Sequence, residues 1–501
     1  MTLSIVVGQG SSTASKITST TTTSLVCAIA GFAGLLILRW KRKQNEPPSF
    51  NMGLPIIGGM IQFLKDPLVL LAKGKEKHGE CFQVNLMGKQ MICLVGEKGH
   101  EFFFTMDKYL DQAKMYSFTI PIFGKKVLYD VDYSKRMCQI RFIRERLTPD
   151  SLKSYVETLE NEILQYFSEE WSGDEGVRDI RAAMIECLSR TSVSCLMGNE
   201  LREKLNVEVA PGRSVSDLLH DLEYGMLPLS VFMPSFPCPR HWRRDEARRL
   251  LQDFFVPVLA ERRKHKDKMK GKDFLQKVLT STYPDGSSAS DEEIVGFLIA
   301  AFFGGMHNSS ITTSWSILEI FSRPALAAEI MAEQATALGG LDPSLPFSYE
   351  AYEAMPKLRS AVMETLRMHP PLMLLMRTVE EDVPFNGYKI PRGSMVAVSP
   401  TVAGKLPEIF PNPDVFEPMR FLEKPPNEFA YIGFGAGRRV CKGQEFGYLQ
   451  IMATISMMMR TYEIETLDGV TKPTIGEGMV IAPSQPCRVH FKRRSSCLKG
   501  A

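Results

Sequence analysis

Phe434-Gly-Ala-Gly-Arg-Arg-Val-Cys-Lys-Gly443 is the stretch of this sequence that gives a cysteine its most unusual setting. Gly435 and Gly437 allow a tight loop whose backbone can approach a flat ring closely. Gly443 then allows a helix to begin, because the residues after it are apolar at helical spacing. Cys441 would lie just ahead of that helix, where free N–H groups and the positive dipole end favour a thiolate. The loop therefore indicates a thiolate ligand for a porphyrin iron, with a buried structural cysteine as the alternative.

The composition of the 501 residues is that of a folded protein with a large core, at 44% hydrophobic and 23% charged. The 60 basic and 57 acidic residues leave a formal charge of +3, which gives no case for nucleic-acid binding. None of the ten cysteines forms a CxxC pair or has zinc-site spacing. We therefore expect the cysteines other than Cys441 to be reduced and structural.

The N-terminal part predicts a membrane anchor. Residues 1–24 are rich in Ser and Thr and predict a disordered or lumenal segment. Residues 17–38 carry no charge and predict one transmembrane helix, followed by basic residues and Trp40 at the interface. A cleaved signal peptide is the alternative, but the positive charge follows the apolar run. Residues 39–59 then predict a basic linker rich in Pro and Gly.

The rest of the chain predicts one mostly α domain over residues 60–493, with a small β region and a tail at 494–501. Alternating and β-branched residues at 81–95 and 385–398 predict the strands.

Two long helices are marked by their ends. Ser290 and Glu293 form a capping box, and the apolar helix that follows continues to Phe321 and should cross the interior. A second helix should cover roughly 352–368 and end before the two prolines at 370 and 371.

Three charged residues are candidates for holding the cysteine loop. Glu364 and Arg367 stand three residues apart on one helix face, and Arg420 can share the same carboxylate. Each motif is weak alone, but with the Cys441 loop their order and spacing resemble the cytochrome P-450 superfamily. The resemblance implies a heme-thiolate monooxygenase fold, an ion network of these three residues, heme b, and electrons from NADPH through a reductase.

Two further stretches resemble the sterol 14α-demethylase family, especially its plant obtusifoliol 14α-demethylases. One runs from Tyr116 to Ser134, and the other is Gly305-Met-His-Asn-Ser-Ser. The resemblance implies that the heme contacts, besides the iron ligand Cys441, are Tyr116, Tyr129, Arg377, Phe434, Gly435, Gly437, Arg439 and Gly443. It implies that the substrate contacts are Tyr116, Phe118, Phe123, Met306, Leu374 and Met376. Phe at position 118 is associated with sterols that carry one C4-methyl group.

His307, Asn308 and Ser309 are the candidate catalytic residues. A lone histidine on an apolar helix is more often a satisfied core residue. Beside two glycines, where a helix can open, His307 could instead relay protons, directly or through a carboxylate. Asn308 replaces the family's Thr, and an amide can hold water but cannot relay a proton as a hydroxyl does. Ser309 and Ser310 are the substitutes, and Lys126 likewise replaces a family Gly.

The resemblance implies removal of a sterol 14α-methyl group by three O2- and NADPH-dependent oxidations with release of formate. It also implies a single-pass protein of the endoplasmic reticulum membrane whose catalytic domain faces the cytoplasm. Arg438 and Lys442 would then face an acidic reductase. The alternatives are an oxygenase for another sterol position or lipid, a reductase-independent isomerase of a peroxide, and a silent heme sensor.

Overall fold

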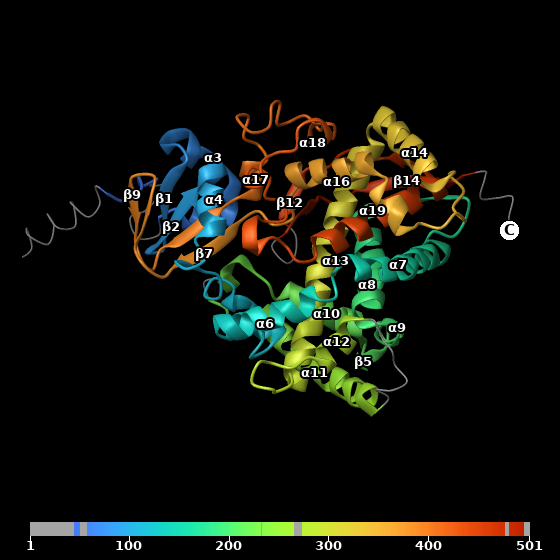
Figure 1. The fold of residues 1–501 in the computed structure, drawn as a ribbon, viewed down its shortest axis with the longest axis horizontal. Helices are drawn as coiled ribbons and strands as arrows, with labels where there is room; N and C mark the ends of the chain where they lie inside the picture. Colours follow the sequence, from blue (N-terminus) through green and yellow to red (C-terminus); the bar gives the residue numbers. More distant parts are fainter. Residues whose placement is uncertain (1–44, 51–57, 232, 265–272, 476–479, 495–501) are drawn as a thin grey trace, which may run out of the picture.

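The computed structural model describes residues 45–50, 58–231, 233–264, 273–475 and 480–494. Helices make up most of this part, and the main sheet forms a smaller region on the left of Figure 1. The predicted mostly α fold with a small β region is therefore confirmed. The expected N-terminal segment and membrane anchor lie outside the described residues, as do most of the linker and the tail.

Helix α13 (Asp291–Phe321) passes through the middle of the molecule (Figure 1). Its capping box is formed as predicted, because the Ser290 hydroxyl accepts from the Glu293 N–H and the Glu293 carboxylate accepts from the Ser290 N–H. Among the described residues α13 alone is long and apolar enough to span a membrane, but 72% of its most apolar stretch is buried in the protein. It is the central core helix.

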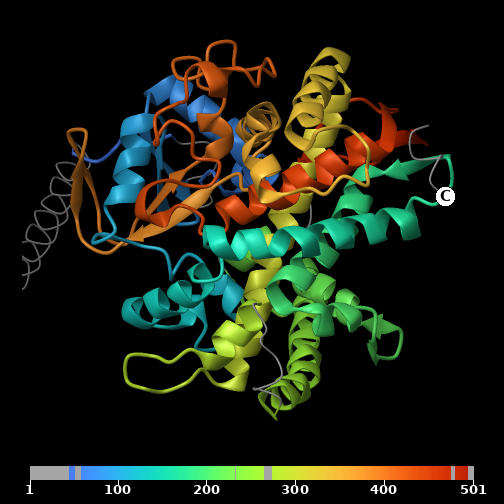
Figure 2. The ribbon, with the colours of Figure 1, turned by 45° about the vertical axis from the view of Figure 1, so that its right-hand side comes forward.

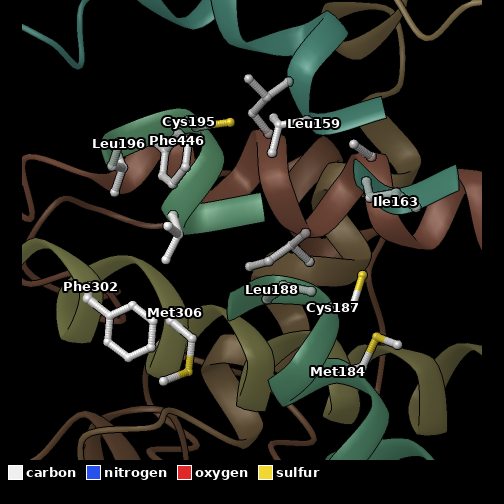
Figure 3. Packing of buried hydrophobic residues seen from close by; sticks show 14 of the residues in the cluster. Leu159, Ile163, Met184, Cys187, Leu188, Cys195, Leu196, Phe302, Met306 and Phe446 are labelled. Atoms are coloured by element: carbon white, nitrogen blue, oxygen red, sulfur yellow. The ribbon is translucent and has the colours of Figure 1, made fainter. Parts of the chain in front are cut away.

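The main hydrophobic core lies where four helices meet. These are α7 (Pro149–Glu170), α8 (Ile180–Met197), α13 and α19 (Gln444–Thr461). Figure 2 shows α7 and α19 side by side across α13, and Figure 3 shows the apolar side chains between them. Full burial of one such Leu or Met side chain contributes about 1.5–3 kcal/mol, so this core fixes the position of α13.

The main sheet joins strands from distant parts of the chain, in the order β1-β2-β10-β7-β3. Strands β1 and β2 are antiparallel, β2 and β10 are parallel, and β7 is antiparallel to both β10 and β3. The strands predicted at 81–95 and 385–398 are confirmed, whereas β7 and the C-terminal strands were not predicted. Their bounds are β1 Cys81–Leu86, β2 Lys89–Leu94, β3 Leu110–Asp111, β7 Leu375–Val379, β8 Val383–Phe385, β9 Tyr388–Ile390 and β10 Met395–Val398.

The second predicted helix is two helices. Helix α15 (Tyr349–Glu353) ends before a short turn, and α16 (Pro356–Met368) begins at its proline. Proline has no N–H for a helical hydrogen bond, so it begins a helix rather than continuing one. The predicted end at Met368 is correct.

The remaining elements surround this frame. The helices are α2 Met60–Lys65, α3 Pro67–His78, α4 Glu97–Thr105, α5 Ile120–Phe123, α6 Tyr133–Arg144, α9 Asn199–Glu203, α10 Val215–Tyr224, α11 Pro239–Lys264, α12 Phe274–Thr280, α14 Pro324–Leu338, α17 Pro400–Ala403 and α18 Arg420–Glu423. The 3-10 turns are η1 Ser117–Thr119, η2 Leu128–Asp130, η3 Pro228–Val231 and η4 Gly437–Arg439. The other strands are β4 Glu175–Asp179, β5 Glu208–Ala210, β6 Arg213–Ser214, β11 Tyr462–Thr466, β12 Pro473–Ile475, β13 Ile481–Pro483 and β14 Arg488–Arg493.

Candidate active site

The cysteine loop is a closed turn that leads directly into α19. The Cys441 N–H donates to the Phe434 carbonyl at 2.8 Å, which closes the loop. Gly435 and Gly437 have φ angles of 75° and 59°, a left-handed conformation that favours glycine. Gly443 caps α19, which begins at the next residue as predicted.

Cys441 is at once accessible and surrounded by protein. Among the cysteines of the described residues, it alone has an exposed side chain. Desolvation nevertheless raises the pKa of its thiol above the usual value, although the Gly443 N–H and the charge of Lys442 lower it. The predicted stabilisation of the thiolate at the start of α19 is present, but its effect on the pKa is smaller than the effect of burial. Exposure of Cys441 and partial desolvation of its thiol are both compatible with ligation of an iron.

The structure brings Glu364, Arg367 and Arg420 together. The Glu364 carboxylate accepts from Arg367 Nε and Nη2 at 2.7 and 2.8 Å, and from Arg420 Nε at 3.1 Å. The side chains of Glu364 and Arg367 are fully buried. Three backbone carbonyls, of Gly404, Pro413 and Val415, accept the remaining Arg367 N–H groups. A buried ion pair with its hydrogen bonds satisfied in this way fixes the chain around it.

This ion network is connected to the cysteine loop through aromatic side chains. Phe421, next to Arg420, packs edge-on against Tyr431 at 5.1 Å. The Tyr431 hydroxyl donates to the Met363 carbonyl of α16 at 3.3 Å. Phe434 packs on Tyr448 of α19 at 5.0 Å. The loop is thus held between the network on one side and α19 on the other.

Arginine and tyrosine side chains from four parts of the chain gather beside the loop. Arg377 and Arg439 both bind the Asp107 carboxylate, at 3.2 and 2.9 Å. Burial lowers the pKa of Arg377 to about 10 in spite of Asp107. Tyr116 and Tyr129 stack at 5.2 Å. Burial raises the pKa of both phenols, so they remain hydrogen-bond donors at neutral pH.

Three further members of this arginine–tyrosine cluster were missed by the sequence analysis. Asp107 connects the two predicted arginines from the end of α4, and no local motif marks it. Arg136 of α6 is buried, lies 3.4 Å from Asp111, and acts electrostatically on Tyr129 together with Arg439. With two aspartates against three arginines, the cluster is suited to bind further carboxylates.

Helix α13 leaves one face open in its middle. Gly304 is exposed, and a Cβ added there would meet nothing within 4 Å. Ala301 and Asn308, three residues before and four residues after Gly304 on the same helix face, are partly exposed, whereas most of the residues between them are buried. Asn308 is therefore the polar side chain on the open face.

Two other predicted residues of α13 lie away from that face. Ser309 is buried, with its hydroxyl oxygen 3.8 Å from the position of a Cβ on Gly447 of α19. Met306 is 1% exposed and packs in the core, where Figure 3 shows it beside Phe302. The structure does not place either side chain with Asn308, because their positions on the helix point elsewhere.

His307 has an acidic partner that its sequence context did not reveal. Its Nδ1 lies 3.2 Å from Glu223 Oε1 of α10, and both side chains are buried. Glu223 Oε2 lies 3.9 Å from Nδ1 of His220, which is about half exposed. The three side chains form a series that leads from the surface to the open turn of α13. The carboxylate considered beside His307 is therefore present, and a contact between α10 and α13 supplies it.

The remaining predicted substrate residues pack on the arginine–tyrosine cluster, on α13 and on the main sheet. Phe118 is buried and packs against Tyr116 at 6.0 Å. Phe123 packs against Phe303 of α13 at 6.4 Å. Leu374 and Met376 are partly buried beside the core of the main sheet.

A model of the cytochrome P450 family matches residues 47–491. The chain belongs to the cytochrome P450 family. The predicted recognition, fold and enzyme class are thereby confirmed, as are heme and NADPH-derived electrons as the cofactors of a heme-thiolate monooxygenase.

Three curated relatives of this cytochrome P450 are similar over most of their length. "Sterol 14-demethylase" of Arabidopsis thaliana is 37% identical, with 90% of this chain and 92% of that protein covered. "Obtusifoliol 14-alpha demethylase" of Triticum aestivum is 34% identical, covering 90% and 99%. "Lanosterol 14-alpha demethylase" of Homo sapiens is 34% identical, covering 95% and 92%.

A solved structure shows the same fold. Retinoic acid-bound cyanobacterial CYP120A1 superimposes with a TM-score of 0.77 at 21% identity, covering 90% of this chain and 99% of that one. The residues of this cytochrome P450 also fit heme. Cys441 is exposed and can act as a ligand, and the cluster next to its loop holds three arginines against two aspartates, which suits the two heme carboxylates.

Proposed function

We propose that this cytochrome P450 is a sterol 14α-demethylase, which removes the 14α-methyl group as formate in three O2- and NADPH-dependent oxidations. The observation that carries the proposal is the identity of 34–37% to 14-demethylases over nine tenths of the chain or more. Fold alone does not identify a substrate, so the likeness of the whole chain to these proteins is needed.

The heme would be held from two sides. Cys441 would ligate the iron, with Phe434 and the glycines of the loop against the ring. The two carboxylates of the heme would bind the arginine–tyrosine cluster. Charge-assisted hydrogen bonds from Arg377 and Arg439, with the hydroxyls of Tyr116 and Tyr129 beside them, would hold these carboxylates strongly. When bound, heme supplies the activation of O2, and the thiolate favours O–O cleavage.

The buried pair of His307 and Glu223 would supply protons. Glu223 can take up a proton from the His220 side and pass it to His307, because its two oxygens face the two imidazoles. Asn308 would hold water on the open face of α13. Ser309, buried toward α19, would act only through the helix backbone.

The sterol would occupy the space bordered by Phe118, Phe123, Leu374 and Met376. Apolar side chains with a few polar groups suit a ligand that is almost wholly hydrocarbon. We propose a preference for sterols with one C4-methyl group, following Phe118.

A membrane and a reductase are the proposed partners, with the endoplasmic reticulum as the location and the catalytic domain in the cytoplasm. Ile61 of α2 and Met87 of the turn between β1 and β2 are 65% and 64% exposed, and a bridge between Gly58 and Leu86 connects the two segments. Exposed apolar side chains near the start of the described chain suit contact with lipid. Arg438 and Lys442 flank the thiol and suit an acidic reductase surface.

Sterol titration of the heme-loaded protein tests the proposal. Sterols with one C4-methyl group should displace water from the iron, shift the heme absorption band, and bind more tightly than 4,4-dimethyl sterols. The absence of a shift with either class would contradict the proposal.

Asn308 favours a second candidate, a heme-thiolate isomerase, which would convert a lipid peroxide without a reductase.

A further inference from the structure

The segment from Phe123 to Asp130 contains a strained turn that the proposed function does not explain. Lys126 and Leu128 have φ angles of 61° and 47°, in the left-handed region. For residues other than glycine this conformation is strained, because the Cβ comes too close to the following carbonyl oxygen. Strained backbone persists only where the surrounding structure determines it. Something must therefore hold this turn.

The buried amide of Gln139 in α6 holds both strained residues. Its oxygen accepts from the Leu128 N–H at 2.7 Å, and its nitrogen donates to the Lys126 carbonyl at 2.9 Å. Gln139 is 0% exposed, so these bonds have no competition from water. The Asp130 carboxylate accepts from the Lys126 N–H at 2.8 Å and completes the turn.

Gln139 is itself anchored on the beginning of α13. Its nitrogen also donates to the Tyr283 hydroxyl at 3.2 Å, and that hydroxyl donates to Glu293 at 3.1 Å. Glu293 completes the capping box of α13 and pairs with Lys135 at 2.7 Å. The strained turn is thus connected through Gln139 to the helix that carries the open face.

Both ends of the segment reach the candidate site. The Phe123 carbonyl accepts from Arg248 and lies against Gly296 of α13, where an added Cβ would come within 2.2 Å of it. At the other end Tyr129 directly follows Leu128 and stacks on Tyr116. The position of Tyr129 therefore depends on the turn that Gln139 holds.

We propose that Gln139 is a positioning residue, which holds the strained turn at Lys126 and Leu128 and thereby places Tyr129 and Tyr116 beside the arginines that receive the heme carboxylates. The inference rests on the heme site of the proposed function but not on the identity of the sterol. It also explains how Lys126 can stand where the family has glycine, because the hydrogen bonds from Gln139 offset the backbone strain of a residue with a side chain.

Release of hemin from the purified ferric protein to an excess of apomyoglobin tests the inference without turnover. Gln139→Ala removes the two hydrogen bonds that hold the turn. We expect hemin release to accelerate about tenfold, which corresponds to about 1.4 kcal/mol. Tyr129→Phe should reduce the effect of Gln139→Ala, because the amide acts through Tyr129.

The matched control is Gln334→Ala. Gln334 of α14 is also 0% exposed and accepts from Ser456 at 2.7 Å, but its partners lie in α19 rather than in the segment. It should lower the midpoint of unfolding by a similar amount and leave hemin release unchanged. Equal release rates for the two variants would overturn the proposal.

Lys126→Gly tests whether Gln139 acts by offsetting the strain of the turn, because glycine adopts a positive φ without strain. In the Gln139→Ala background it should restore most of the slow release, and in the Gln334→Ala background it should change nothing. Equal effects in both backgrounds would show that the two residues are not coupled and would overturn the proposal. If these results are obtained but the protein yields no formate from sterols, the positioning role of Gln139 stands and the proposed sterol demethylase function is wrong.

Discussion

Glu364→Gln tests how the cysteine loop is held. The substitution keeps the shape of the side chain but removes the charge that two arginines share, and leaves Arg367 fully buried beside a neutral amide. The amide nitrogen cannot accept the hydrogen bonds that a carboxylate oxygen accepts. Breaking a buried ion pair at one partner costs about 3–5 kcal/mol. Arg367 keeps three carbonyl acceptors, so we expect the lower end, about 3 kcal/mol.

Denaturant unfolding of the purified protein measures this loss, and the carbon monoxide difference spectrum shows whether the thiolate still ligates the iron. The matched control is Glu417→Gln, whose 54% exposed carboxylate lies 3.3 Å from Arg420. A surface pair of this kind contributes about 0–1 kcal/mol, so the control should keep its stability and its spectrum. The reasoning fails if Glu364→Gln unfolds within about 0.5 kcal/mol of the control and keeps the full thiolate spectrum.

Three other perturbations follow from the structure. Glu223→Gln should lower sterol turnover about 100-fold with sterol binding unchanged, and equal turnover would exclude Glu223 from proton delivery. Lys126→Gly should raise the free energy of unfolding in urea by about 0.5 kcal/mol, since relief of the positive φ exceeds the added freedom of glycine. Although burial raises the pKa of Glu319, His369 and Arg323 lower it below its usual value. This carboxylate therefore stabilises the fold above the unfolded pKa of about 4.3, and the contribution is lost as pH falls through the lower folded pKa. In urea, Glu319→Gln should have a lower free energy of unfolding than the unsubstituted protein at neutral pH, and the same free energy in acid. An equal loss at both pH values would contradict this.

Local motifs were enough to predict the features whose partners lie near in sequence. The loop of Cys441 and the capping box at Ser290 are each specified within ten residues, and both form as expected. Arg420 lies 56 residues from Glu364, yet the shared order of motifs brought it into the predicted network.

Long-range partners were not predictable in this way. Asp107 meets Arg439 across 332 residues, and Glu223 meets His307 through the packing of α10 near α13. An acidic residue on a surface helix gives no local sign that tertiary packing will bury it. Met306 was predicted as a substrate contact because it precedes His307 in the sequence. Adjacent residues on a helix point in different directions, and Met306 is buried in the core instead.

Formate release is the measurement that decides most directly whether this cytochrome P450 demethylates sterols. The full-length protein would be reconstituted in vesicles with an NADPH-dependent reductase and a 14α-methyl sterol with one C4-methyl group. We predict one formate for each sterol converted, dependent on NADPH and absent for Cys441→Ala. Bound sterol without formate, together with conversion of a lipid peroxide in the absence of reductase, would contradict the demethylase function and favour the isomerase.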